Sequence, residues 1–150
     1  MASVTLSLDE SAFSAFKADV LTHAREAVPE ATKALVGFAG ATISKRLEGF
    51  GSIRRIDTTR LQGSYETAAS QIASTPVPHG EAVVASDVVA ETLATGLTTT
   101  YRIGSDAHYA GYIEYGTEKI VAGLHVDSTA YDATRAAQTV CTPFLRRAFA

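Results

Sequence analysis

The chain has 150 residues, of which 46% are hydrophobic and 19% charged, and its formal net charge is −3. These values predict one folded domain, exclude a disordered chain and give no reason to expect nucleic acid as the main ligand. Cys141 is the single cysteine, so no internal disulfide forms, and we interpret it as a buried apolar residue. We expect no secretory signal and no membrane span.

Two helices are predicted in the first third of the chain. Residues 3–8 alternate between polar and apolar, which is typical of a short strand or an extended arm. Asp9 is then placed to cap a helix over 10–27, whose apolar side chains repeat with the helical period: Phe13, Phe16, Val20, Ala24 and Ala27. Pro29 predicts a break and the start of a second helix over 29–48.

The second predicted helix has one face of small residues, namely Ala34, Gly37, Gly40, Ala41 and Ser44. Interior glycines weaken a helix, and the usual compensation is the close approach of another backbone. That neighbour is the first helix, the sheet or another subunit. The opposite side carries residues that we expect in the core: Leu35, Phe38, Ile43 and Leu47.

A basic connector follows over residues 49–64. Positive charges outnumber negative ones around it, with Lys45, Arg46, Arg54, Arg55 and Arg60 against Glu48 and Asp57. Two interpretations stay open: a solvated loop, or a contact with an acidic partner surface or a passing DNA backbone.

The pattern then becomes typical of a sheet. Strands are predicted over 65–74, 81–92 and 97–103, and either a strand or a long β-arm over 119–126, with a turn at 74–80 and a hairpin turn at 94–96. In the third strand, Leu97, Thr99, Tyr101 and Ile103 should point inward. Short connections favour an antiparallel order. The predicted fold is therefore α+β, with two N-terminal helices packed on a mostly antiparallel sheet of about four strands.

The last third is predicted to include a long loop or arm at 118–142. Within it, residues 128–140 are rich in alanine and form either a short helix or an irregular loop. Pro143 should begin a short helical or extended end that offers Phe144, Leu145 and Phe149 for packing.

Three tyrosines fall at regular spacing in residues 103–117: Tyr109, Tyr112 and Tyr115. A helical turn would place them on roughly one face, where they either close a core or form part of an interface. We expect them to be partly buried and, together with Glu114, to order the turn between the sheet and the arm.

No catalytic, metal-binding or cofactor-binding pattern is present in the sequence. Ser105, Asp106 and His108 are adjacent, but no nucleophile elbow surrounds them. The histidines are scattered, and the glycines occur without a phosphate-binding loop. We therefore expect a protein that is not an enzyme and binds no cofactor or metal. A small hydrolase would need Asp106, His108 or Cys141 to converge in one pocket.

Three segments carry a resemblance to a known family: residues 57–64 (DTTRLQGS), 103–117 (IGSDAHYAGYIEYGT) and 143–148 (PFLRRA). In the same order, they resemble D-T-G-R-L-x-x-S, V-G-x-x-x-x-Y-A-x-Y-x-E-x-G-T and a terminal P-F-L-R-P-A. These are the motifs of the tail-component proteins of long-tailed bacteriophages and related prophage or gene-transfer particles, which join heads to tails. The resemblance covers nearly the whole chain. It departs at Thr59, where the family has glycine, and at 118–142, where the family has far fewer residues.

The resemblance implies a structural protein of the virion neck, assembled in the host cytoplasm. Such subunits form a ring, commonly a hexamer, that completes the tail tube and surrounds the DNA path. Its implied partners are further copies of itself, the tail tube protein and the head–tail connector protein. DNA in the channel would lie nearby without specific contacts, and no membrane is involved.

On this basis we predict a subunit or partner interface at nine residues: Arg54, Arg55, Arg60, Tyr112, Glu114, Tyr115, Thr117, Ile120 and Leu124. We also expect Arg60 to form an ion pair with Glu114. The alternative is a soluble adaptor or regulatory module that binds one protein partner outside any virion.

Overall fold

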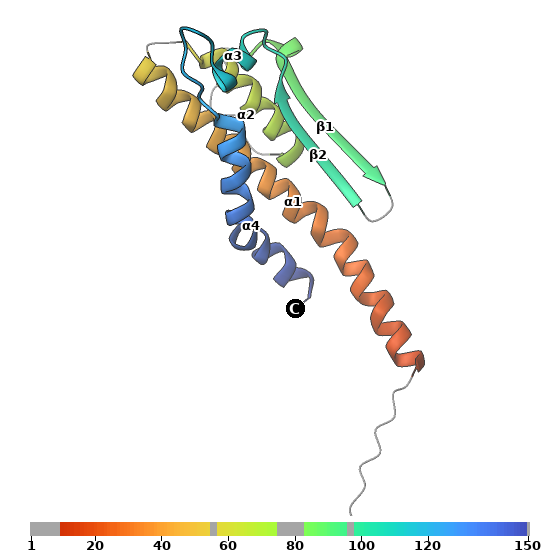
Figure 1. The fold of residues 1–150 in the computed structure, drawn as a ribbon. Helices are drawn as coiled ribbons and strands as arrows, with labels where there is room; N and C mark the ends of the chain where they lie inside the picture. Colours follow the sequence, from red (N-terminus) through yellow and green to blue (C-terminus); the bar gives the residue numbers. More distant parts are fainter. Residues whose placement is uncertain (1–9, 55–56, 75–82, 96–97, 150) are drawn as a thin grey trace, which may run out of the picture.

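The computed structural model describes residues 10–54, 57–74, 83–95 and 98–149. Within these ranges the chain is mostly helical and has one two-stranded antiparallel sheet (Figure 1). The prediction of two helices on a sheet of about four strands is therefore wrong. The predicted arm at 3–8, the Asp9 cap, Arg55, Leu97 and most of the 74–80 turn lie outside the described residues.

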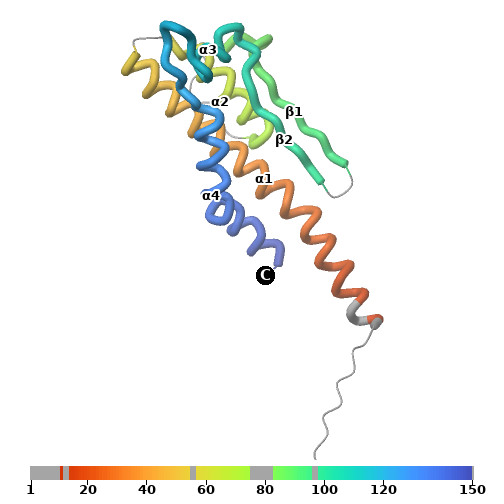
Figure 2. The backbone as a smooth tube through the Cα atoms, in the orientation of Figure 1, coloured from red at the N-terminus to blue at the C-terminus, as the bar shows by residue number. Residues whose placement is uncertain are grey.

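The first element is a single long helix, α1 (Glu10–Arg54), which continues through Pro29. The predicted break is wrong, although a proline inside a helix costs about 3 kcal/mol. Ala27 and Ala31, on either side of the proline, are both buried, and the Cys141 thiol of a later helix lies 3.5 Å from the Ala31 carbonyl oxygen. We attribute the unbroken helix to this long-range packing. The N-terminal turns of α1 extend beyond the other elements (Figures 1 and 2).

The second helix, α2 (Thr59–Ala73), packs against α1 through small residues. A Cβ atom added at Gly40 would lie 2.3 Å from the Cβ of Ala69, and one added at Gly37 would lie 3.3 Å from the Cβ of Ala73. The close approach that the sequence predicts at these glycines is confirmed, and the neighbour is α2. The predicted strand at 65–74 is wrong, because its alanine and glutamine residues favour a helix.

The predicted hairpin is confirmed with shifted ends. A short 3-10 turn (Ala85–Asp87) leads into β1 (Val88–Thr95), which pairs with β2 (Thr98–Ser105) from Val88 opposite Ser105 to Thr95 opposite Thr98. The predicted alternation in β2 is also present: Thr99, Tyr101 and Ile103 are half-buried, whereas Thr98, Thr100 and Arg102 are exposed.

Two helices complete the chain, α3 (Ala110–Tyr115) and α4 (His125–Ala148), and α4 packs along α1. The predicted strand at 119–126 is wrong, because residues 121–124 are irregular and the helix begins at His125. The long arm at 118–142 is wrong for the same reason. Of the two options for 128–140 the helix is correct, and it runs through Pro143 instead of ending before it.

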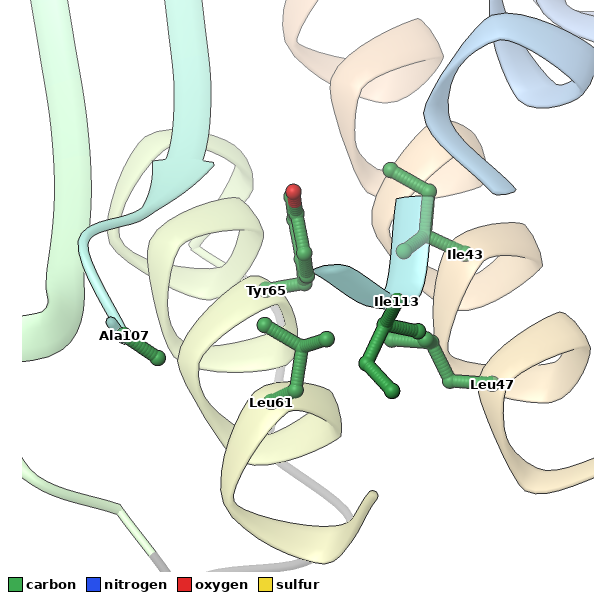
Figure 3. Packing of buried hydrophobic residues seen from close by; sticks show 6 residues of the cluster. All are labelled: Ile43, Leu47, Leu61, Tyr65, Ala107 and Ile113. Carbon is green, nitrogen blue, oxygen red and sulfur yellow. The ribbon is translucent and has the colours of Figure 1, made fainter. Parts of the chain in front are cut away.

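The hydrophobic core lies where α1, α2 and α3 meet (Figure 3). Ile43 and Leu47 enter it from α1, as predicted, and meet Leu61 and Tyr65 of α2 and Ile113 of α3. Burial raises the pKa of Tyr65 to about 12. This core fixes α3 in place, and α3 in turn positions the start of α4.

Candidate functional site

The segment 57–64 joins α2 to its neighbours. The Asp57 carboxylate accepts a hydrogen bond from the Thr59 backbone N–H at 3.0 Å, which lowers the pKa of Asp57. The buried Thr58 hydroxyl lies 3.0 Å from the Leu47 carbonyl oxygen of α1 and accepts a hydrogen bond from the Gln62 amide at 2.9 Å. The start of α2 is thereby tied to α1.

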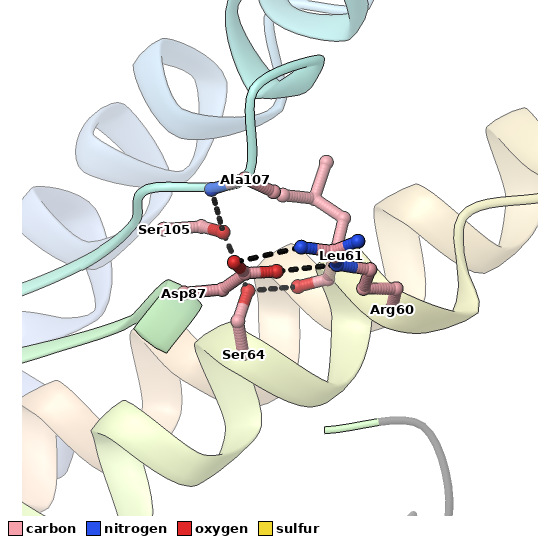
Figure 4. Close-up of polar contacts among 6 residues, drawn as sticks. All are labelled: Arg60, Leu61, Ser64, Asp87, Ser105 and Ala107. Carbon is pink, nitrogen blue, oxygen red and sulfur yellow. Dashed lines mark hydrogen bonds and ion pairs between the residues drawn. The ribbon is translucent and has the colours of Figure 1, made fainter. Parts of the chain in front are cut away.

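Two further residues of this segment bind the hairpin (Figure 4). Arg60 makes a two-point ion pair with the buried Asp87, with Nη2 2.9 Å from Oδ1. These hydrogen bonds hold the pKa of Asp87 below its ordinary value and raise that of Arg60. The hydroxyls of Ser64 and Ser105 are 2.7 Å apart. The predicted Arg60–Glu114 ion pair is wrong, because Asp87 at the entrance to β1 is the partner of Arg60.

The Glu114 carboxylate caps the first turn of α4 instead. It is buried, and it accepts hydrogen bonds from the backbone N–H groups of His125 at 2.7 Å, Val126 at 3.0 Å and Asp127 at 3.2 Å. A helix begins with N–H groups that have no partner inside the helix, and its dipole favours negative charge there. Glu114 therefore joins the end of α3 to the beginning of α4.

The loop between α3 and α4 folds tightly around Gly116. Gly116 has φ +79°, and a Cβ added to it would lie 2.6 Å from the Ile120 carbonyl oxygen. The Thr117 hydroxyl accepts hydrogen bonds from the backbone N–H groups of Lys119 at 3.2 Å and Ile120 at 3.1 Å. Leu124 enters α4 with φ +48°. The Glu-x-Gly-Thr part of the segment thus builds a compact loop, which the prediction of an extended arm missed.

A buried polar pair lies on the α1-facing side of α4. The His125 ring packs edge-on against Phe50, with ring centroids 4.9 Å apart, and burial lowers the pKa of His125. Its Nε2 atom and the hydroxyl of Thr129, one turn later, have no hydrogen-bond partner among the described residues. Neither residue belongs to a motif that marks it in the sequence.

Exposed apolar side chains gather around the loop between α3 and α4. Tyr112 is 57% exposed, Tyr115 71% and Val121 61%, and Leu124 and Val126 are also exposed. Backbone hydrogen bonds from Gly123 to Ile113 and from Leu124 to Glu114 hold the loop against α3. The expectation of partly buried tyrosines holds for Tyr109 but is wrong for Tyr112 and Tyr115. We call the five exposed residues the α3–α4 patch.

The other predicted interface residues are divided. Ile120 is half-buried and Thr117 is exposed beside the patch. Arg54 is exposed at the end of α1. Part of the positive charge of the connector is neutralised inside the protein, because Arg46 pairs with Asp132 of α4 and Arg60 pairs with Asp87.

The residues considered for a hydrolase do not converge, because Cys141 lies on a different element from Asp106 and His108. Asp106 and His108 are exposed in the turn before α3, whereas Cys141 lies against Ala31 on the C-terminal half of α4. In the part of the chain that the structure describes, no group of histidine, cysteine and acidic side chains is arranged to hold a metal ion. Among the described helices, none combines the length and apolar character needed to cross a bilayer.

Comparisons with family models, with curated proteins and with solved structures found no match to this chain.

Proposed function

We propose that this protein is a structural subunit of the neck of a long-tailed phage or a related particle, where a ring of subunits completes the tail tube and joins it to the head. The observation that carries the proposal is the presence of three family-like segments in the family's order. The three segments, residues 57–64, 103–117 and 143–148, follow one another in this order between positions 57 and 148.

The structural roles of these residues support the proposal. The contacts that join α2, the hairpin, α3 and α4 are made by residues of these segments, namely Arg60, Ser64, Glu114 and Gly116. Residues that hold the fold together are constrained more strongly than surface residues, so a family pattern is expected at such positions. Thr59, which replaces a glycine, sits in the first turn of α2, where threonine is easily accommodated.

The α3–α4 patch is the second line of support. Exposed apolar side chains from two adjoining segments are typical of a surface that binds another protein. We assign this patch to a partner in the neck, either an adjacent subunit, the tail tube or the connector. In this proposal Arg54 and Arg55 face the channel or the adjacent ring, where they would contact DNA phosphates or acidic side chains.

Electron microscopy of the purified protein, and of particles produced without it, tests the neck role. We expect rings from the protein, and separate heads and tails from particles that lack it. Adding the wild-type protein to those heads and tails should restore joined particles. A Y115S/V121S variant should fold normally and fail to restore joining, whereas a Y131S variant, exposed on α4 outside the patch, should restore it.

Normal joined particles without the protein would refute the neck role and favour an adaptor outside the virion. Restoration by Y115S/V121S would leave the neck role standing and remove the patch from it.

A further inference from the structure

The N-terminal half of α1 carries an apolar face that the other described residues cover only in part. Phe16, Val20, His23 and Ala27 share one face of α1 by their spacing. Ala27 is buried, and Phe149 packs edge-on against His23 with ring centroids 6.1 Å apart. Past this contact Phe16 is 64% exposed, and Phe149 itself is 53% exposed. We call Phe16, Val20 and Phe149 the distal face.

A second apolar feature lies further along the same helix. A groove of about 720 Å³ runs between α1, α2 and the end of α4. Its lining combines apolar residues with polar and charged ones: Ala34, Gly37, Phe38, Ala41, Ala69, Ala73 and Phe144 together with Glu30, Lys33, Ser44, Lys45, Glu48 and Glu66. Grooves of this volume and composition accept apolar side chains of a partner. Phe144 belongs to the family-like segment 143–148, and the distal face lies just beyond that segment.

The Phe16 end of the distal face cannot enter the groove of its own molecule. Phe16 and Ala41 are about 37 Å apart along the axis of the continuous helix α1, at about 1.5 Å per residue. We propose that the distal face of one copy of this protein occupies the α1–α2–α4 groove of a second copy. The contact joins two different surfaces, which is the kind of contact that a cyclic ring requires.

The charges beside the two surfaces select an orientation. At about 100° per residue, Lys17 and Asp19 lie on opposite edges of the distal face, and Lys45 and Glu48 lie on opposite sides of Ala41 in the groove. Neither Lys45 nor Glu48 forms an ion pair with another described residue. Parallel packing of the two α1 helices brings Asp19 to the side of Lys45 and Lys17 to the side of Glu48. Antiparallel packing opposes like charges instead.

A parallel arrangement leaves one groove and one distal face free at the two ends of each pair, so that further copies add in the same way. This inference deepens the proposed neck role and rests on it for closure into a ring. It also leaves the α3–α4 patch free for the tail tube or the connector. The subunit contact is tested by cross-linking of the purified protein, whereas the neck role is decided by particles that lack the protein, so that either can fail without the other.

Disulfide cross-linking of the full chain tests the contact. In a C141S background, one protein carries F16C and another carries A41C, and both positions are exposed. Under mild oxidation we expect a covalent dimer from the mixture and none from either protein alone. The F16C/A41C double variant should give a ladder of products larger than a dimer. An F16S variant should lower the sedimentation coefficient toward that of a monomer, whereas V28S, also exposed on α1 but outside both surfaces, should not.

Charge reversal tests the orientation. The D19K variant should associate more weakly than wild type, by up to about fivefold for an exposed pair, and D19K/K45D should recover. Self-linking of F16C alone, or no product from the mixture while rings persist, would overturn the proposed contact. Products limited to dimers in the double variant would overturn the parallel arrangement.

Discussion

Both carboxylate oxygens of Glu114 lie within hydrogen-bonding distance of the Val126 backbone N–H, at 3.0 and 3.1 Å. One buried side chain of α3 therefore holds the first turn of α4, which has no capping side chain of its own. Because α4 is a main packing partner of α1, this single carboxylate links the core to the longest helix pair of the molecule.

Removing the Glu114 carboxylate should destabilise the protein. E114A leaves the first N–H groups of α4 without partners, and we expect a loss of about 1–3 kcal/mol in the free energy of unfolding. E114Q keeps one acceptor oxygen and should lose less. Urea unfolding measures the change, and hydrogen exchange should localise it to the first turn of α4. The control is E118A at an exposed position, which should change stability by about 0.5 kcal/mol or less. Equal losses of unfolding free energy in E114A and E118A would show that the Glu114 cap does not stabilise the protein.

The close contact of α1 and α2 at Gly40 should not accept a methyl group. A Cβ there would lie 2.3 Å from the Cβ of Ala69, so G40A must force the helices apart, at about 1–3 kcal/mol. G49A is the matched control in the same helix, since no described atom lies within 4 Å of its added Cβ. It should stabilise the protein by about 0.5–1 kcal/mol. Thermal unfolding of both variants, and of G40A/A69G as a rescue, measures this. A stabilised G40A would contradict the contact.

The Arg60–Asp87 pair should make stability depend on acid pH. Its hydrogen bonds lower the pKa of Asp87 in the folded state below its ordinary value of 3.8. The ion pair is therefore fully stabilising above pH 3.8, the pKa of the unfolded chain. Its contribution is lost as the pH falls from there through the lower pKa of the folded state. D87N should lower the urea midpoint at pH 7, and the difference from wild type should shrink at pH 3. D106N, at an exposed position, is the control. A difference that stays constant between the two pH values would argue against this ion pair.

Local sequence patterns predicted structure correctly, whereas long-range contacts overturned other predictions. Alternation in β2 and the small-residue face at Gly37 and Gly40 are local patterns, and both predictions hold. The prediction of a break at Pro29 was wrong because the buried neighbours Ala27 and Ala31 face a helix more than a hundred residues away in the sequence. The prediction of a strand at 119–126 was wrong because the Glu114 carboxylate accepts hydrogen bonds from the N–H groups of His125 and Val126. These bonds favour the start of a helix over the strand that the alternation indicates.

The candidate interface was predictable only in part. The spacing of Tyr112 and Tyr115 indicated a shared helical face but not its exposure, since the core contact of α3 is made by Ile113 and Glu114. Within residues 103–117, Glu114 holds the first turn of α4 and Gly116 allows the tight loop between α3 and α4. Asp87 was missed as the partner of Arg60, because only the tertiary fold brings the entrance of β1 to α2.

His125 should give the protein a second pH dependence, near neutrality. Burial lowers its pKa below 6.5, with the nearby Glu114 opposing the shift and Arg46 adding to it. The unfolded chain therefore binds the proton more readily, so stability is fully present above pH 6.5 and falls below it. We expect a lower urea midpoint at pH 5 than at pH 7.5 in wild type and a smaller drop in H125Q. H108Q, at an exposed histidine, should keep the wild-type drop. If the urea midpoint of H125Q fell between pH 7.5 and pH 5 as much as that of wild type, His125 would not be the cause of the pH dependence.

Arg54 and Arg55 provide a test in particles. Arg54 is exposed at the end of α1, with no ion pair to another described residue. If this end faces the channel or the adjacent ring, R54E/R55E should place negative charge against phosphate or acidic groups. The variant should fold and form rings as wild type does but leave heads and tails separate. Supplying each variant to particles that lack the protein, and counting joined particles by microscopy, measures the effect. R54K/R55K keeps the charge and should join normally, so a joined yield from R54E/R55E equal to that of R54K/R55K would assign these arginines to a solvated surface.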